Sequence, residues 1–346
     1  MPTMKKAILY APNELRVEEV PVPKLESGDF LIKVTGSLVC GTDVRIYTGA
    51  KTKNVTLPST LGHEFAGTIV EANGPLPEGL QIGDQVAVCP VVSCGECSAC
   101  RGGHPNICRN RTAFGYQYDG GLAQYVRIPA VARGNVFAVN GVSPTEAAII
   151  EPAACALNGQ NLAEVKGART VLVAGTGPLG LLHIRLAKVQ GVKNVIAVEP
   201  NIERHEKARE SGADLVLAPG NEAFAKIAEA APDGIDVLIA AIGLPEAIYP
   251  YSGLLAPGAR ISAFAGFKSD ARLDFLANDI HYNEWKVVGA SSCRVENFAE
   301  IAPMVSSGQL AVADLIGTQL PLDQAVEALN LAASGADMRV GVDPWA

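Results

Sequence analysis

A short glycine-rich stretch constrains the fold of this chain more than any other feature. Residues 171–174 form an apolar run typical of a buried parallel strand, and residues 179–188 carry apolar residues at helical spacing. Between them lies a Gly-x-Gly-x-x-Gly pattern, which lets a strand turn tightly into a helix and presents free helix N-terminal amides to a pyrophosphate. The pattern predicts a dinucleotide-binding unit, with cofactor contacts from Gly175, Gly177, Pro178, Leu179 and Gly180.

Glu199 bears on which dinucleotide is bound. It ends a second apolar run, residues 195–198, and follows Gly180 by nineteen positions. A carboxylate at this place accepts hydrogen bonds from the ribose hydroxyls of adenosine and repels a 2′-phosphate. We therefore expect NAD rather than NADP. Arg204, which lies nearby in the sequence, is a further cofactor-binding candidate because its cation suits a phosphate.

Length and charge exclude several classes of protein. The 346 residues, 48% of them hydrophobic, are enough for two domains. A net charge of -8 disfavours nucleic acid and anionic membranes as partners. The amino-terminal segment has no apolar core for export, and no apolar run is long enough to span a membrane. We expect a cytoplasmic protein that binds a small molecule.

The pattern of apolar runs changes along the chain and indicates an α/β protein of two domains. Short β-rich runs alternate with turns over residues 5–88, as in a barrel-like domain. From about residue 153, six apolar runs alternate with helical segments, as in a doubly wound nucleotide domain. We expect a β-rich domain at 1–152, a nucleotide-binding domain at 153–289, and a segment at 290–346 that returns to the first domain.

Four of the eight cysteines form the strongest metal-binding signal, in a lobe at about residues 89–110. Their spacing is Cys94-x-x-Cys97-x-x-Cys100-x7-Cys108. Four thiolates this close can complete a tetrahedral shell around zinc, and a complete shell leaves no position for chemistry. A disulfide or a redox pair leaves two cysteines unexplained. We therefore expect a structural zinc site here.

A second group of residues in the first domain also has metal-binding chemistry. It consists of Cys40, Thr42, Asp43, His63, Glu64 and Glu151, the last of which opens a helical segment with proline in its first turn. Together Cys, His and Glu provide sulfur, nitrogen and oxygen ligands for a zinc ion that keeps one position open for a substrate. Taken singly, Cys40 suits a buried small side chain, His63 a hydrogen-bonded core residue, and Glu151 a helix N-terminal charge.

The motifs in this order resemble the zinc-dependent medium-chain alcohol dehydrogenases over essentially the whole chain, and most closely their sorbitol (polyol) and threonine dehydrogenase branch. The order is Cys-Gly-Thr-Asp, Gly-His-Glu, the four-cysteine lobe, Glu-Pro and Gly-x-Gly-Pro-x-Gly. The resemblance implies a GroES-like catalytic domain, a Rossmann NAD-binding domain and two zinc ions per chain. It also implies a homo-oligomer, a tetramer rather than a dimer.

The resemblance implies a role for each residue of the second group. Catalytic zinc is held by Cys40, His63 and a carboxylate, for which Glu64 and Glu151 are both candidates. Asp43 accepts the ring N–H of His63 and so fixes its tautomer. Thr42 takes the proton of the alcohol. The structural zinc site maps onto Cys94, Cys97, Cys100 and Cys108.

The implied activity is hydride transfer between NAD and a secondary alcohol, namely a polyol, a sugar alcohol or a sugar. A 3-hydroxy amino acid such as threonine is the alternative substrate, suggested by the local sequence CGTDVRIYTG. Its carboxylate requires a cation, for which Arg45 and Arg294 are candidates. An alternative of another class is a non-catalytic zinc-binding or sensor protein. The acidic charge and the intact set of Cys40, His63 and Glu151 disfavour it.

Overall fold

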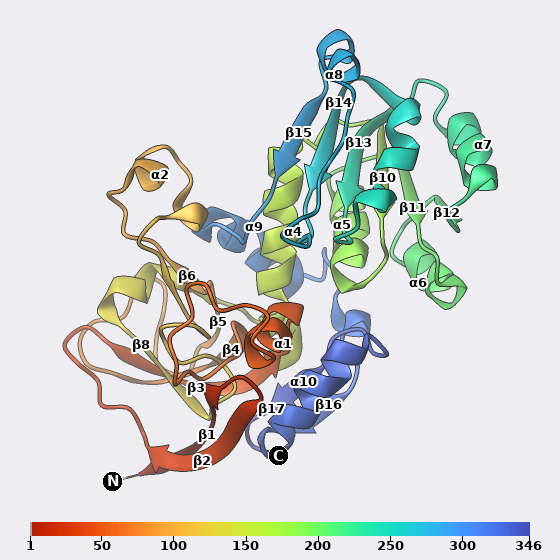
Figure 1. Cartoon of the computed structure of the whole chain (residues 1–346). Helices are drawn as coiled ribbons and strands as arrows, with labels where there is room; N and C mark the ends of the chain where they lie inside the picture. The colour runs from red at the N-terminus through yellow and green to blue at the C-terminus, as the bar shows by residue number, and fades with distance from the viewer. Residues whose placement is uncertain (1) are drawn as a thin grey trace. The chain divides into compact units, whose positions relative to one another are not determined.

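The computed structural model describes residues 2–346, which divide into two compact units (Figure 1). The first unit comprises the chain up to Ala154 together with Ser292–Ala346, and the second comprises Cys155–Ser291. Helix α4 (Ile150–Leu162) begins in the first unit and continues into the second. No helix in the described chain is long and apolar enough to cross a lipid bilayer.

The first unit is built on a seven-stranded sheet. The strand order is β16-β17-β3-β4-β5-β9, with β8 paired to β3. The strands are β3 (Phe30–Leu38), β4 (Glu64–Ala72), β5 (Gln85–Val88), β8 (Tyr125–Ile128), β9 (Val136–Ala138), β16 (Gln319–Pro321) and β17 (Gly341–Asp343). Phe30, Ile32 and Val34 alternate along β3 and pack in one apolar cluster with Phe65 and Ile69. This cluster supports the strand ends from which the site residues project.

The remaining elements of the first unit pack around this sheet. The strands and α-helices among them are β1 (Thr3–Ala11), β2 (Glu14–Pro21), β6 (Val91–Val92), β7 (Thr112–Ala113), α1 (Gly41–Tyr47), α2 (Ser98–Arg101), α3 (Pro144–Ala148), α9 (Val295–Ser306) and α10 (Ala325–Ser334). A second apolar cluster joins Leu9 of β1, Ile46 of α1 and Leu329 of α10. The C-terminal segment therefore belongs to this unit, and its strand β17 pairs antiparallel with β3.

The second unit contains a six-stranded sheet in the order β12-β11-β10-β13-β14-β15, and every pair is parallel. The strands are β10 (Thr170–Ala174), β11 (Asn194–Val198), β12 (Leu215–Leu217), β13 (Ile235–Ala240), β14 (Leu255–Ala263) and β15 (Lys286–Gly289). The helices are α5 (Pro178–Val189), α6 (His205–Glu210), α7 (Asn221–Ala230) and α8 (Ala277–Asn283). The order confirms the predicted doubly wound domain, and it reverses beside β10, where nucleotides bind in this architecture.

Candidate functional site

Three side chains from two segments of the chain meet where β3 ends and β4 begins. Cys40 lies between β3 and α1, His63 precedes β4, and Glu64 is the first residue of β4, paired in register with Leu38. The Sγ atom of Cys40, a ring nitrogen of His63 and a carboxylate oxygen of Glu64 lie within 4.8 Å of one another. A single metal ion can bind all three atoms at this separation.

Asp43 organises this group from α1. Its Oδ1 atom lies 3.2 Å from Nδ1 of His63 and also accepts the N–H of Gly62 at 3.2 Å. Its Oδ2 atom accepts the N–H of Cys40 at 2.9 Å, which the separation of three residues at a helix start makes possible. Because Asp43 engages Nδ1, the Nε2 atom of His63 remains for a metal.

Burial and neighbouring charges oppose each other at Cys40 and His63. Burial raises the pKa of Cys40, but His63 and then Arg339 lower it, and the resulting pKa is about 7. Burial lowers the pKa of His63, but the charges of Asp43 and Cys40 hold it well above its ordinary value. The thiolate of Cys40, which is the form that binds metals, is therefore accessible near neutral pH.

Glu64 is completely buried, and Arg339 forms an ion pair with it. The Nη2 atom of Arg339 lies 3.0 Å from Oε1 of Glu64. Neither oxygen of Glu64 accepts a hydrogen bond of regular geometry from the residues in the structure. Burial raises the pKa of Glu64 to about 8, although Arg339 opposes the rise. A buried carboxylate with free acceptor positions is suited to a metal cation.

The other two predicted residues of this group lie nearby. Thr42 is half-buried in the first turn of α1. Glu151 is buried in the first turn of α4, where its carboxylate lies within 4.8 Å of the Sγ atom of Cys293. Glu151 does not belong to the Cys40 group, but its charge raises the pKa of Arg339. Of the two candidate carboxylates, the structure thus brings Glu64 to Cys40 and His63.

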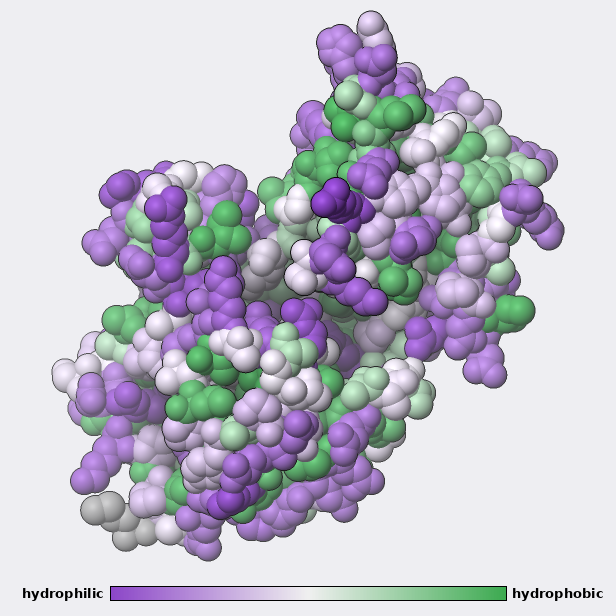
Figure 2. All heavy atoms as spheres, viewed as in Figure 1, coloured by the Kyte–Doolittle hydropathy of each residue, from purple (hydrophilic) through white to green (hydrophobic). Residues whose placement is uncertain are grey.

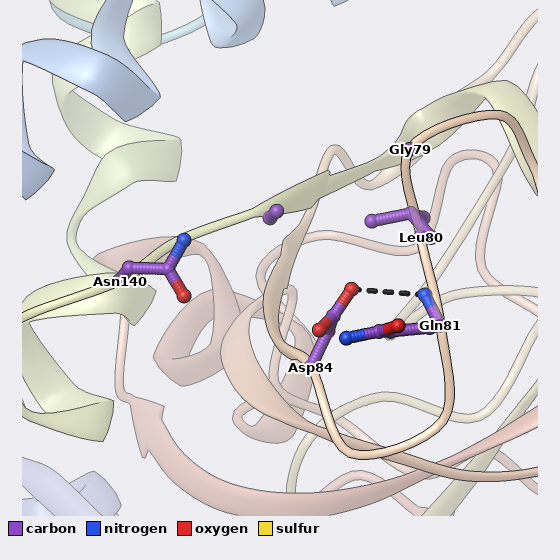
Figure 3. Close-up of a pocket in the computed structure, with 6 residues that line it drawn as sticks. Gly79, Leu80, Gln81, Asp84 and Asn140 are labelled. Atoms are coloured by element: carbon purple, nitrogen blue, oxygen red, sulfur yellow. Dashed lines mark hydrogen bonds between the residues drawn. The ribbon is translucent and has the colours of Figure 1, made fainter.

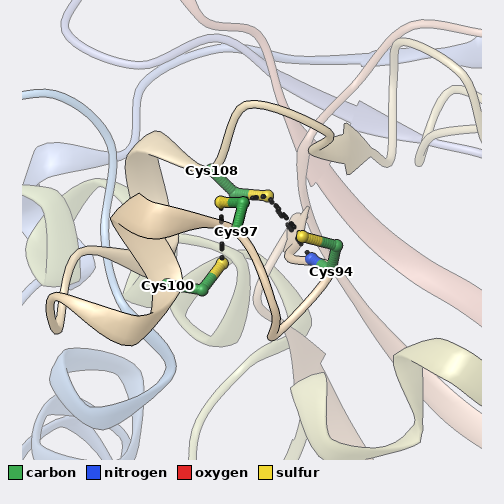
Figure 4. Close-up of side chains that lie close together, drawn as sticks. All are labelled: Cys94, Cys97, Cys100 and Cys108. Carbon is green, nitrogen blue, oxygen red and sulfur yellow. Dashed lines mark hydrogen bonds between the residues drawn. The ribbon is translucent and has the colours of Figure 1, made fainter.

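The four clustered cysteines converge on one point around α2 (Figure 4). The Sγ atom of Cys108 lies 3.4 Å from that of Cys94, and the Sγ atom of Cys97 lies 3.6 Å from that of Cys100. Hydrogen bonds from main-chain N–H groups lower the pKa of Cys97 to about 6. All eight cysteines are free thiols. Four free thiols at these separations form a complete tetrahedral ligand set.

A surface hollow of about 450 Å³ in the first unit lies apart from these groups (Figure 3). Its lining residues are Gly79, Leu80, Gln81, Asp84, Ala138 and Asn140. Asp84 accepts the main-chain N–H of Gln81 at 2.9 Å, so its carboxylate is already engaged. The six lining residues include no cysteine or histidine, and the hollow has no ligand set for a metal.

The glycine loop of the second unit has the geometry that a dinucleotide requires. Gly175 has φ +93°, a conformation that L side chains rarely adopt. A Cβ atom on Gly180 would lie 1.9 Å from the carbonyl oxygen of Gly175, whereas a Cβ atom on Gly177 would have no neighbour within 4 Å. Pro178 and Leu179 begin α5. The space at Gly177, where α5 starts, is therefore open, as binding of a phosphate by helix N-terminal amides requires.

Glu199 follows β11 and is held by hydrogen bonds. Its Oε2 atom accepts the N–H of Thr176 at 2.8 Å and the hydroxyl of Thr176 at 2.9 Å. Its Oε1 atom accepts the N–H of Asn201 at 3.0 Å. A carboxylate has about four acceptor positions, so one remains for a ribose hydroxyl. Arg204 is half-buried at the end of the 3₁₀ helix Ile202–Arg204.

Comparison with known proteins gives the same assignment for both units. Residues 26–137 match the alcohol dehydrogenase GroES-like domain, and residues 178–307 match the zinc-binding dehydrogenase domain. L-threonine 3-dehydrogenase of Pyrococcus abyssi (strain GE5 / Orsay) is 34% identical over 329 residues, which cover 93% of each chain. The chain belongs to the zinc-dependent medium-chain alcohol dehydrogenase family.

Two further relatives of this dehydrogenase cover almost its whole length. D-arabinitol dehydrogenase 1 of Uromyces fabae is 27% identical and covers 99% of this chain and 98% of its own. The alcohol dehydrogenase RspB of Escherichia coli CFT073, solved in complex with NADH, has a TM-score of 0.86 at 29% identity and covers 99% of each chain. These matches confirm the predicted family and the predicted GroES-like and Rossmann architecture.

Sequence reasoning missed three residues of this enzyme that the structure brings to the predicted groups. Arg339 pairs with Glu64, the hydroxyl of Thr176 holds Glu199, and Lys51 lies over the ring of Tyr116. No motif in the sequence marks Arg339 or Lys51. Thr176 lies inside the glycine pattern, where its hydroxyl was a usable signal because the pattern leaves that position open.

Proposed function

We propose that this dehydrogenase oxidises a secondary alcohol of a polyol, sugar alcohol or sugar with NAD, and that it binds two zinc ions per chain. The observation that carries the proposal is the Cys40, His63 and Glu64 group, whose ligand atoms lie within 4.8 Å of one another. The buried oxygens of Glu64 lack regular hydrogen bonds, so a cation there supplies the missing partner. The second zinc ion binds Cys94, Cys97, Cys100 and Cys108, which form a closed set.

When bound, zinc would supply a Lewis acid that makes the alcohol more acidic, and NAD would supply the hydride acceptor. The residues of the chain prepare this chemistry. Asp43 holds the ring of His63 through Nδ1, so that Nε2 is the ligand atom. Thr42, two residues after Cys40, takes the proton of the alcohol. Glu151 lies close enough to influence Arg339, so it remains the alternative carboxylate ligand.

The cofactor proposal rests on the second unit. The glycine loop with Gly175, Gly177 and Gly180, followed by Pro178 and Leu179, binds the diphosphate at the start of α5. Glu199 accepts one ribose hydroxyl and disfavours a 2′-phosphate, while Arg204 lies in the helix that follows. The NADH bound to the RspB relative supports this cofactor class.

A second candidate substrate is a 3-hydroxy amino acid. The 34% identity with L-threonine 3-dehydrogenase of Pyrococcus abyssi favours it. Of the two cations expected to meet its carboxylate, Arg294 turns to the cysteine lobe, where its Nη2 atom lies 3.2 Å from Nδ1 of His104. Arg45 is exposed on α1. A carboxylate partner therefore has to be sought around Arg45 rather than Arg294.

We also propose a cytoplasmic homo-oligomer, a tetramer by family resemblance. Eight free thiols are typical of a reducing compartment. Within the described chain, β15 pairs only with β14, which leaves an open sheet edge. Val287 on this edge is 43% exposed, and Leu276 and Tyr282 beside or on α8 are 72% and 78% exposed. Figure 2 shows hydrophobic side chains on the visible surface of the second unit near β15 and α8. A second copy can cover such an edge. Light scattering should give a molecular mass that is a multiple of 36.1 kDa. Val287→Lys should lower this mass.

The decisive experiment is a screen of polyols, sugars and 3-hydroxy amino acids with NAD and NADP, accompanied by a zinc count. We expect two zinc ions per chain, turnover with NAD, and loss of turnover when zinc is removed from protein that stays folded. Activity that survives zinc removal would refute the proposal. One zinc ion, with dinucleotide binding but no turnover, would instead support a non-catalytic zinc protein.

A further inference from the structure

Lys51 lies in the first unit beside two other cations, Arg45 and Arg111, whose charges act on it; we name the three residues the Lys51 cluster. The N–H of Lys51 donates to the carbonyl oxygen of Arg45 at 2.8 Å. The Nζ atom of Lys51 lies 5.5 Å from the ring centroid of Tyr116. The same ring centroid lies 5.9 Å from that of His63. Tyr116 thus links the cluster to the proposed zinc site.

Most of the charges that act on Lys51 are positive. Burial lowers the pKa of Lys51, and the charges of Arg45 and Arg111 lower it further, while Cys40 opposes them. No carboxylate in residues 2–346 forms an ion pair with any of the three. The side chain of Arg111 donates to the main-chain oxygen of Asn106, at 3.0 Å. Lys51 is half-buried, so its charge costs free energy until an anion joins it.

Nearby acidic groups do not supply this anion. Asp43 is occupied by His63, Gly62 and Cys40, and Glu64 is paired with Arg339. The surroundings of the Lys51 cluster therefore leave its positive charge available. An oxyanion is the ligand that guanidinium and ammonium groups bind through charge-assisted hydrogen bonds.

We infer that the Lys51 cluster binds a carboxylate or phosphate carried by the alcohol substrate, whose hydroxyl oxygen lies at the Cys40, His63 and Glu64 group. This inference rests on the proposed dehydrogenase function and, of its two candidate substrate classes, favours the one that carries an acidic group. The substrate is a hydroxy acid, a sugar acid, a 3-hydroxy amino acid or a sugar phosphate, rather than a neutral polyol. Tyr116, within 6 Å of both Lys51 and His63, lines the path between the two ends of this substrate.

Matched substrate pairs test the inference with the zinc-loaded enzyme. Gluconate is compared with sorbitol, and threonine with 1-amino-2-propanol, which lacks only the carboxylate. We expect higher kcat/KM for the acid of at least one pair. Lys51→Met should lower the acid-to-neutral ratio of kcat/KM by roughly 10- to 100-fold, mainly through KM, because a charge-assisted contact is lost. Lys51→Arg should keep most of the ratio.

The matched control is Lys53→Met, which removes the charge of an exposed lysine two residues away and should leave the ratio unchanged. The dissociation constant of NADH shows whether the Lys51 cluster binds the oxyanion of the substrate or the diphosphate of the cofactor. If Lys51→Met weakens NADH binding and leaves the acid-to-neutral ratio intact, the cluster serves the cofactor diphosphate and the inference is overturned. If Lys51→Met lowers kcat/KM equally for acids and for neutral alcohols, the inference is also overturned, because this result indicates a structural role for Lys51.

Binding measurements keep this test separate from that of the proposed function. Calorimetric titration of gluconate and of inorganic phosphate into wild type and Lys51→Met reports oxyanion binding without turnover. If wild type oxidises neutral alcohols as well as acids and both proteins bind gluconate equally, the inference fails while the dehydrogenase assignment stands. If no alcohol is oxidised, the proposed function fails, whatever the titrations give.

Discussion

Two buried glutamates, one in each unit, differ in how their charge is stabilised. Glu64, at the start of β4, has an ion-pair partner in Arg339, but neither of its oxygens accepts a regular hydrogen bond from the described residues. Glu199, after β11, accepts two hydrogen bonds from Thr176 and one from Asn201. Glu64 is the first residue of its strand, whereas Glu199 follows the carboxyl end of its strand, where ligands bind in doubly wound sheets.

The difference reflects what each carboxylate is prepared to bind. Hydrogen bonds from N–H and O–H groups stabilise Glu199 in one orientation, as recognition of a neutral ribose hydroxyl requires. Burial raises the pKa of Glu64 to about 8, so its charge is poorly stabilised by the protein alone. A bound metal ion would stabilise this charge, so a buried carboxylate with incomplete hydrogen bonding indicates a metal site.

The largest expected effect comes from disrupting the Cys40, His63 and Glu64 group while leaving the cofactor site intact. Cys40→Ser should lower turnover by about 10³-fold or more, because the metal loses its thiolate ligand. NADH binding, measured by fluorescence titration, should stay within twofold of wild type. Glu199→Gln is the matched variant, since it should weaken NADH binding and leave the zinc content at two. If Cys40→Ser weakens NADH binding as strongly as Glu199→Gln, the two sites are not independent.

Removing Arg339, the ion-pair partner of Glu64, tests through the free energy of unfolding how the charge of Glu64 is stabilised. Arg339→Met leaves a buried carboxylate without its cation and should lower the free energy of unfolding of zinc-depleted protein by about 3 kcal/mol. The double variant Arg339→Met/Glu64→Gln should recover at least about 1 kcal/mol of that loss. Chemical denaturation measures both. Strictly additive effects of the two substitutions would contradict the pairing.

His183 is an incompletely bonded buried group of the second unit. Its Nε2 atom has no partner within the described chain, and burial lowers its pKa to about 3 from an ordinary 6.5. Between these values the unfolded chain binds a proton that the folded chain does not, so stability falls as pH falls. The loss should reach about 2 kcal/mol at pH 5. Urea unfolding at pH 7 and pH 5 should show a smaller loss of unfolding free energy for His183→Leu than for wild type. The control is His281→Gln, at an exposed site, which should lose as much as wild type.

The smallest expected effect tests the hydrogen bonds that hold Glu199. Thr176→Val keeps the shape of the side chain but removes the hydroxyl, so NADH binding should weaken by roughly 5- to 10-fold. Discrimination against NADPH should decrease as well, because the carboxylate of Glu199 is then less restrained and can move away from a 2′-phosphate. Thr176→Ser, which retains the hydroxyl, serves as the control. Unchanged affinities for both cofactors in Thr176→Val would show that Thr176 does not position Glu199.

The fold class and the ligand types could be predicted because their signals are local. The apolar run before Gly175 predicts β10, and the spacing of Cys94, Cys97 and Cys100 predicts their convergence around α2. The three-residue separation of Cys40 and Asp43 likewise places both at one helix start. Short-range geometry is set by the backbone, so spacing in the sequence becomes spacing in the structure.

The sequence by itself determined the family, the doubly wound sheet and the kinds of metal ligand. Only the tertiary structure decided that Glu64 joins Cys40 and His63, that Arg339 pairs with Glu64, and that the cation of Lys51 lies over the ring of Tyr116. These contacts join residues from distant parts of the chain. Their free energies depend on burial and on neighbouring charges, which exist only once the apolar clusters have brought the strands together.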